Sequence, residues 1–123
     1  MRRDFLWSKI HAATVTAARR DYMGSLTLGR DLLEAAQLAP FQRIEVYNIT
    51  SGRRFATYVI AGEPGVVCVN GAAAHLARVG DSIIIAAYCQ LEVHEVEKFT
   101  PRLVFVDADN RQIALEESKE TVT

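Results

Sequence analysis

Residues 24 and 25 form a Gly-Ser pair that could react within the backbone. Glycine reaches backbone angles that other residues avoid, so in a strained turn the Ser25 hydroxyl could approach the Gly24 carbonyl. This arrangement permits an N-to-O acyl shift, in which the hydroxyl oxygen replaces the amide nitrogen on the carbonyl carbon. Gly-Ser is also a common turn dipeptide, and on its own the pair favours a structural turn.

Further polar residues fall in segments that are expected to be strands. Lys9 and His11 are two residues apart and Arg54 and Tyr58 are four apart, so each pair shares one face of its strand. Thr57 points away from the face of Tyr58 unless a bulge redirects it. A cationic side chain on an inward face is costly unless it meets an anion, so an anion-binding site is one interpretation. The other is that these faces are simply exposed to solvent.

Other common types of reactive site are not supported. The side chains that most often bind transition metals are scattered without ligand spacing, which predicts no metal site: His11, His75, His94, Cys68 and Cys89. The chain has no G-x-S-x-G serine elbow and no glycine cluster beside Lys-Ser or Lys-Thr that would hold a phosphate. Both cysteines lie in apolar runs and are expected to be buried free thiols, although a disulfide stays open.

The size and charge of the chain restrict its class. Its 123 residues suffice for one domain, and 50% are hydrophobic, which is enough to fill one core. The formal net charge of −1 argues against a nucleic-acid partner. No apolar segment of a signal peptide follows the charged start, and no apolar run approaches the roughly 20 residues that span a membrane. We therefore expect a soluble, cytoplasmic protein.

The hydrophobic pattern predicts a mainly β protein. Leucines and alanines at helical spacing before Pro40 predict one substantial helix, and the small residues after Asn70-Gly71 predict one or two helical turns. Residues 17–22 are ambiguous between strand and helix, residues 25–28 look extended, and the tail after Glu116 is expected to fray. Strands are expected over residues 9–16, 43–49, 54–60, 66–69, 82–91, 102–106 and 112–115. Because closure protects strand edges, we expect a small closed barrel of six or seven strands with one or two short helices, a single domain over residues 1–123.

Several short motifs resemble the pyruvoyl-dependent aspartate 1-decarboxylase family, whose members make β-alanine for pantothenate. The resemblance covers nearly the whole chain, and its motifs are weak singly but specific in this order and spacing. They are Lys9-Ile10-His11, Thr14-Val15-Thr16, Tyr22-Met23-Gly24-Ser25, residues 48–58, residues 69–75, and Gly80-Asp81 with the isoleucines that follow. A shorter loop at residues 62–65 and the segment 92–100 depart from the family pattern.

The resemblance implies a double-psi β-barrel and a break between Gly24 and Ser25 after translation. The break gives a short β chain (residues 1–24) and a longer α chain (residues 25–123), and it converts Ser25 into a covalent pyruvoyl group. This ketone, rather than pyridoxal phosphate or a metal, condenses with the amine of L-aspartate and accepts electrons as the α-carboxylate leaves. The products are β-alanine, used for pantothenate and coenzyme A, and carbon dioxide.

The resemblance also implies roles for single residues. Thr57 would stabilise the oxyanion during cleavage and contact the substrate, and Tyr58 would donate a proton to the substrate. Arg54 and Lys9 would bind the two substrate carboxylates. The remaining site residues would be the substrate-binding backbone of Gly71, Ala72 and Ala73, together with His11, Tyr22 and Asn70 nearby.

The resemblance further implies a homotetramer with active sites between subunits, and it leaves open whether a partner assists maturation. Two other functions also stay open. The chain could be an uncleaved barrel that acts in binding or assembly, or a pyruvoyl decarboxylase for another amino acid. The two cationic residues favour a dicarboxylate, because a neutral or basic substrate would leave one of them unpaired.

Overall fold

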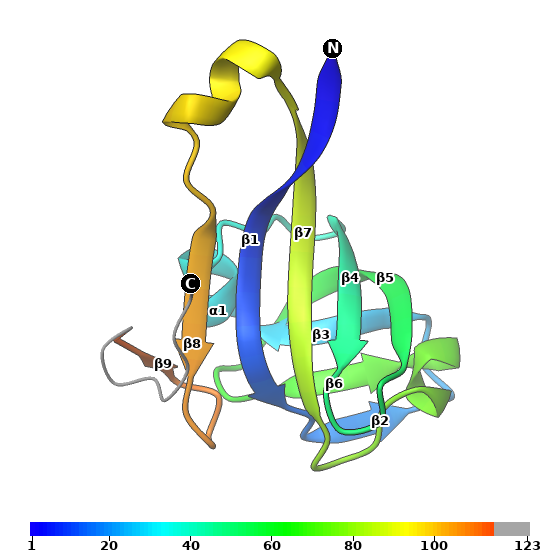
Figure 1. Cartoon of the computed structure of the whole chain (residues 1–123). Coiled ribbons are helices and arrows are strands. Elements are labelled where there is room, and N and C mark those ends of the chain that lie inside the picture. Colours follow the sequence, from blue (N-terminus) through cyan, green and yellow to red (C-terminus); the bar gives the residue numbers. More distant parts are fainter. Residues whose placement is uncertain (115–123) are drawn as a thin grey trace.

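The computed structural model describes residues 1–114, and strands dominate this part of the chain (Figure 1). The strands are β1 (Arg2–Thr14), β2 (Ala17–Arg19), β3 (Ser25–Gly29), β4 (Arg43–Asn48), β5 (Arg54–Gly62), β6 (Val67–Asn70), β7 (Ser82–Glu92), β8 (Arg102–Val106) and β9 (Gln112–Ile113). They are joined by the α-helix α1 (Arg30–Ala35) and by two 3-10 helices, η1 (Gly71–His75) and η2 (Val93–Lys98). The predicted mainly β class is confirmed. The predicted count of six or seven strands is too low, because residues 17–22 were ambiguous and residues 25–28 only looked extended, whereas both segments contain strands, β2 and β3.

The strands follow the order β2-β6-β3-β5-β4-β7-β1-β8-β9. In Figure 1, β3, β6 and β2 run across the direction of β1, β7 and β4. Strand β5 connects the two groups, because Arg54–Tyr58 pairs with β4 and Val59–Gly62 pairs with β3. This arrangement is consistent with a small barrel-like fold. Among the pairings within residues 1–114, none joins β2 to β9, so barrel closure stays a prediction.

The longest pairing joins β1 to β7 and extends beyond the rest of the sheet. It runs antiparallel from Arg2 opposite Glu92 to Thr14 opposite Ser82. The predicted start of β1 at Lys9 is therefore wrong, as is its predicted end two residues beyond Thr14. The first residues carry several charges and no strand pattern, so their extended form depends on a partner about 90 residues away in sequence.

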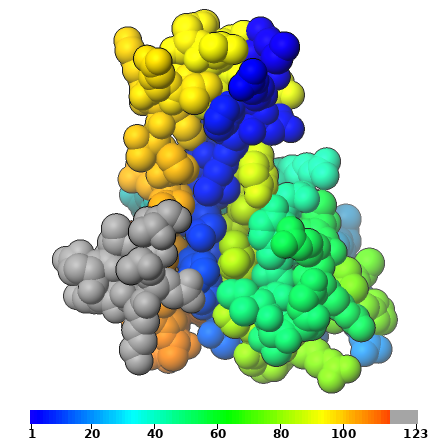
Figure 2. Space-filling view, viewed as in Figure 1, coloured from blue at the N-terminus to red at the C-terminus, as the bar shows by residue number. Residues whose placement is uncertain are grey.

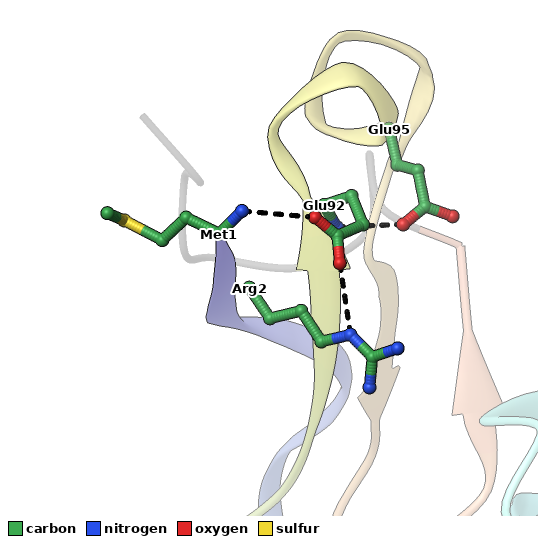
Figure 3. A network of polar contacts seen from close by, with 4 residues as sticks. All are labelled: Met1, Arg2, Glu92 and Glu95. Atoms are coloured by element: carbon green, nitrogen blue, oxygen red, sulfur yellow. Dashed lines mark hydrogen bonds and ion pairs between the residues drawn. The ribbon is translucent and has the colours of Figure 1, made fainter.

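The far end of this pair forms a projecting arm with η2 (Figures 1 and 2). Glu92, at the end of β7, connects β7 to the start of β1 (Figure 3). One of its carboxylate oxygens lies 3.3 Å from the Met1 ammonium, and the other accepts a hydrogen bond from Nε of Arg2 at 3.0 Å. The Glu92 backbone N–H donates to Glu95 at 2.7 Å, as part of the capping box of η2. All these contacts are exposed, so they orient the arm more than they stabilise the fold.

The hydrophobic core lies between the two groups of strands. Its largest fully buried side chains come from β1, β3, α1, β4, β5, β6, β7 and the residue that follows β1: Ile10, Leu26, Leu28, Leu32, Ile44, Ile83, Ile85, Val15, Val46, Val59, Val67 and Val69. The ambiguous segment 17–22 begins as strand β2 rather than as a helix, because Ala17–Arg19 pairs with Cys68–Asn70 of β6. Leu115 and the predicted fraying after Glu116 lie outside the described residues. No helix within residues 1–114 is both long and apolar enough to cross a membrane.

The buried side chain of Asn110 links distant parts of the chain. Its Oδ1 accepts from the Thr14 N–H at 2.8 Å, and its Nδ2 donates to the carbonyls of Thr14 at 2.9 Å and Gly65 at 3.1 Å. Asn110 is 1% exposed and has a φ of 60°, a left-handed conformation that asparagine tolerates better than most residues.

Asn110→Ala should therefore destabilise the protein by about 2 to 4 kcal/mol, because it leaves buried backbone groups without partners at a strained position. Urea unfolding at 25 °C measures the loss. Asp109→Ala, which removes an exposed side chain from the same turn, should change the stability by less than about 0.5 kcal/mol. An Asn110→Ala midpoint equal to that of the wild type would contradict this account.

Candidate active site

Three of the predicted site residues lie side by side on neighbouring strands. Ser25 at the start of β3 is paired with Asn70 at the end of β6. On its other side β3 runs parallel to β5 with Leu26 opposite Val59, so Tyr58 neighbours Ser25. The Asn70 Nδ2 donates to Ser25 Oγ at 3.0 Å, and both residues are 2% exposed. The structure thus places the candidate nucleophile in a buried position beside a fixed amide donor.

Asn70, Ser25 and Tyr58 form a row across the strands β6, β3 and β5, and an arginine lies at each end of this row. Arg19 on β2 is paired with Asn70, and Arg43 on β4 is paired with Tyr58. The Arg19 guanidinium donates to the Tyr22 hydroxyl at 2.9 Å and lies 5.1 Å from the centre of its ring. The exposed Arg43 guanidinium lies 3.5 Å from a carboxylate oxygen of the half-buried Glu45. The row that contains Ser25 therefore ends in a cation on either side.

The close backbone approach at the Gly-Ser bond is made by Gly71 rather than by Gly24. A Cβ on Gly71 would lie 2.6 Å from the Gly24 Cα and 2.7 Å from the Gly24 nitrogen, and Gly71 has a φ of 66°. Both features require glycine at position 71. Gly24 is absent from the described glycines with positive φ, and a Cβ there would meet no atom within 4 Å. The backbone conformation and close approach that only glycine permits are thus found at Gly71, which lies against Gly24.

The predicted carboxylate-binding residues lie away from Ser25 on the outer face of the sheet. Lys9 is in register with Ala86 of β7, which is in register with Glu45 of β4. Three strand spacings, roughly 14 Å, therefore separate the backbone of Lys9 from β5. Arg54 is four residues from Tyr58 along β5, a distance of about 13 Å in a strand. The backbone of one chain does not bring Lys9, Arg54 and Ser25 together.

Arg54 is held by an aromatic pair that the sequence pattern did not single out. Its guanidinium carbon lies 4.5 Å from the centre of the Tyr47 ring, which suits a cation–π contact. The Tyr47 hydroxyl in turn lies 2.7 Å from the Tyr88 hydroxyl. Burial, followed by the hydrogen bond to Tyr88, raises the pKa of Tyr47 to about 12. Tyr47 therefore stays neutral and presents a fixed ring to Arg54.

The remaining predicted residues lie around this region. Thr57 is half-buried opposite Ile44, and the β4–β5 register has no shift, so Thr57 faces away from Tyr58 as a regular strand requires. The half-buried His11 packs against Phe105 with ring centres 5.7 Å apart. In η1, Ala72 is exposed, Ala73 is half-buried and Gly71 is buried.

Sequence reasoning also missed Thr27, whose hydroxyl accepts from Asn70 Nδ2 at 3.0 Å. Its position two residues after Ser25 on an extended segment was a usable signal, because such residues share a strand face. Both cysteines are free: Cys68 is buried as expected, whereas Cys89 is only half-buried. Within residues 1–114, no group of three or more His, Cys, Asp or Glu side chains could hold a metal ion.

The raised pKa of Tyr47 predicts a distinctive titration. Because the folded state binds this proton more tightly than the unfolded chain does, the stability that it contributes is complete below pH 10 and is lost as the pH rises through about 12. Between pH 10 and about 12, Tyr47 is still mostly protonated in the wild type and contributes little phenolate. Midway through this range, wild-type protein and Tyr47→Phe should therefore show equal phenolate absorbance.

Tyr88→Phe serves as the control for this titration. Because it removes the hydrogen-bond partner, Tyr47 should then ionise at a lower pH than in the wild type. A smaller phenolate absorbance in Tyr47→Phe than in the wild type already at pH 10 would show that Tyr47 has an ordinary pKa.

Comparison with known proteins supplies the family. A family model described as aspartate decarboxylase matches residues 1–113. A curated aspartate 1-decarboxylase from Myxococcus xanthus is 50% identical over 115 residues, which cover 92% of this chain and 88% of the relative. One from Hydrogenobaculum is 45% identical over 122 residues, with 99% and 98% covered. One from Thioalkalivibrio sulfidiphilus is 52% identical over 105 residues, with 84% and 83% covered.

These matches span both β3, which carries Ser25, and β6, which carries Asn70. They agree with the resemblance found in the sequence motifs and extend it to nearly all the described strands. The chain belongs to the aspartate decarboxylase family.

Proposed function

We propose that this chain removes the α-carboxyl group of L-aspartate, giving β-alanine and carbon dioxide for the synthesis of pantothenate and coenzyme A. Membership of the family supports the reaction. The structural observation that carries the proposal is the buried Ser25 hydroxyl, which directly follows Gly24 and accepts a hydrogen bond from Asn70. A surface turn, the alternative for a Gly-Ser pair, has no need to bury its serine.

The chain prepares itself by breaking the bond between Gly24 and Ser25. The Ser25 hydroxyl attacks the Gly24 carbonyl to form an ester, and elimination then releases Gly24 as a free carboxylate. Hydrolysis by water releases the Ser25 nitrogen as ammonia and leaves a pyruvoyl group at position 25. The ketone oxygen comes from water and replaces the Ser25 nitrogen, while Oγ leaves with Gly24, so the hydrogen bond from Asn70 Nδ2 to Oγ serves the uncut chain. Conversion also removes the ammonium that a simple break would leave at a position 2% exposed, where a charge is costly.

When present, the pyruvoyl group supplies a ketone that takes up the substrate amine and accepts the electron pair released with carbon dioxide. The chain's own residues do the rest. The Tyr58 hydroxyl, on the strand beside Ser25, delivers a proton to the carbon that has lost its carboxylate. Arg54, already stacked on Tyr47, binds a carboxylate of the substrate, and Lys9 supplies a second positive charge.

We also propose that a second copy of the chain completes each site, within a homotetramer. The support is the separation of these cations from Ser25 in one chain: the backbone of Lys9 lies roughly 14 Å from β5, the strand next to that of Ser25, and Arg54 lies about 13 Å along β5 from Tyr58. A neighbouring copy that contacts this face can bring the cations of one chain to the Ser25 of another.

The remaining members of the site complete the proposal. Thr57 stabilises the oxyanion formed during cleavage and contacts substrate, and the backbone from Gly71 to Ala73 binds substrate. His11 and Tyr22 line the site. Tyr22 is tied to Arg19, one end of the row that contains Ser25, which supports its placement.

Self-cleavage is tested by intact-mass analysis of purified protein during incubation. Wild-type chain should separate into residues 1–24 and a blocked chain 25–123, and it should then convert L-aspartate to β-alanine. Ser25→Ala should stay a single chain and form no β-alanine, because no hydroxyl is left to attack. A wild-type chain that stays whole would favour the binding or assembly function, and turnover of a different amino acid alone would favour another substrate.

The role of Tyr58 is tested by removing only its hydroxyl. Tyr58→Phe should cleave like the wild type, because the attacking hydroxyl is unchanged, but it should decarboxylate about 100-fold or more slowly, the usual effect of losing a general acid. The mass spectrum supplies the control, since equal cleavage shows that the fold and the new chain end are intact. Full turnover by Tyr58→Phe would remove Tyr58 from the mechanism.

A further inference from the structure

The orientation of the Asn70 side chain decides whether its N–H donors or its carbonyl oxygen face the Ser25 hydroxyl. A side-chain amide carries two N–H donors on one atom and a carbonyl acceptor on the other, and a half-turn exchanges them. In the structure both hydrogen bonds donated by Nδ2 go to hydroxyls on β3, those of Ser25 and Thr27, each at 3.0 Å. Hydroxyls accept as readily as they donate, so these two contacts alone do not select this orientation.

The group that selects the orientation is the thiol of Cys68. Its Sγ lies 3.2 Å from Asn70 Oδ1 as a hydrogen-bond donor. Cys68 precedes Asn70 by two residues on β6, so the two side chains share a face, and Cys68 is paired with Thr27 as Asn70 is with Ser25. The Asn70 amide thus contacts three side chains, those of Ser25, Thr27 and Cys68.

The surroundings keep the proton on this thiol. Cys68 is 6% exposed, and burial raises the pKa of its thiol against an opposing effect from Arg19. A protonated thiol has a proton to donate to the Oδ1 carbonyl oxygen, whereas its sulfur is only a weak acceptor for an amide N–H. Rotation of the amide would bring Nδ2 towards the sulfur and leave Oδ1 facing the two hydroxyls.

We propose that Cys68 is a positioning residue for self-cleavage: its thiol fixes the Asn70 amide so that Nδ2, and not Oδ1, meets the Ser25 hydroxyl. This inference rests on the proposed function. In the acyl shift, Ser25 Oγ bonds to the Gly24 carbonyl carbon, the bond from that carbon to the Ser25 nitrogen breaks, and the hydroxyl proton passes to the nitrogen. With Nδ2 donating to Oγ, one lone pair is held, the hydroxyl proton points to the Met23 carbonyl at 3.5 Å, and the other lone pair is left to attack the Gly24 carbonyl carbon. With Oδ1 there instead, the hydroxyl would donate its proton to the amide and turn away.

The test compares three variants by the rate at which freshly purified 123-residue chain disappears from the mass spectrum. Cys68→Ser keeps a donor and should cleave within about 3-fold of the wild-type rate. Cys68→Ala loses the donor and should cleave about 5- to 10-fold more slowly, a factor equivalent to one hydrogen bond. Cys89→Ala, the matched control, removes the other thiol of the chain and should cleave at the wild-type rate.

Both Cys68 variants shrink the side chain, so rescue by serine separates hydrogen bonding from packing. A thermal unfolding curve for each confirms that it is folded at the incubation temperature. Thr27→Val gives an independent measurement, because it leaves the amide held by Cys68 and should slow cleavage less than Cys68→Ala does. Equal rates for Cys68→Ala and wild type, or equally slow Ser and Ala variants, would overturn the role of Cys68. Failure of the wild type itself to cleave would instead overturn the proposed function.

Discussion

The site depends on the position of β3 between β5 and β6. Strand β3 is parallel to one neighbour and antiparallel to the other, and a single register places Ser25 beside both Asn70 and Tyr58. That register is fixed from the opposite face, where Leu26 and Leu28 are fully buried in the core. A slip of one residue would exchange the two faces and put a leucine where the serine stands. Hydrophobic burial on one side of β3 thus sets the chemistry on the other.

The hydrophobic pattern of the sequence predicted the strands that pair with near neighbours along the chain. Strict alternation from Arg43 onward predicted the β4–β5 pair, and the observed pairing of Tyr47 with Arg54 confirms it. The first residues of β1 and the three residues of β2 were missed or ambiguous, because distant strands hold them extended. The meeting of Ser25 with Asn70 was equally invisible to spacing, since 45 residues separate them. Only the resemblance to a family placed them in one site.

The cationic residues Lys9 and Arg54 do not belong to the row that contains Ser25. Lys9 and Arg54 lie on an outer face at positions set by the sheet register, away from Ser25. Arg54 is nevertheless already ordered, because its guanidinium lies over Tyr47, and Tyr47 is fixed by Tyr88. A side chain ordered in advance loses little conformational freedom when it binds a carboxylate. Arg54 on the outer face is therefore held in place by its own chain, although the backbone of one chain does not bring it to Ser25.

The contact between Gly71 and Gly24 has a consequence for the order of events during the protein's lifetime. In the uncut chain the backbone of Gly24 and the carbonyl of Tyr22 lie against Gly71, where a substrate would be bound. Under the proposed function the uncut chain is therefore latent, because the backbone next to the bond to be broken lies over the backbone proposed to bind substrate. In that proposal, breaking one bond would both create the reactive group and free the Gly71 backbone from Gly24, while residues 1–24 stay in the fold through the pairing of β1 with β7.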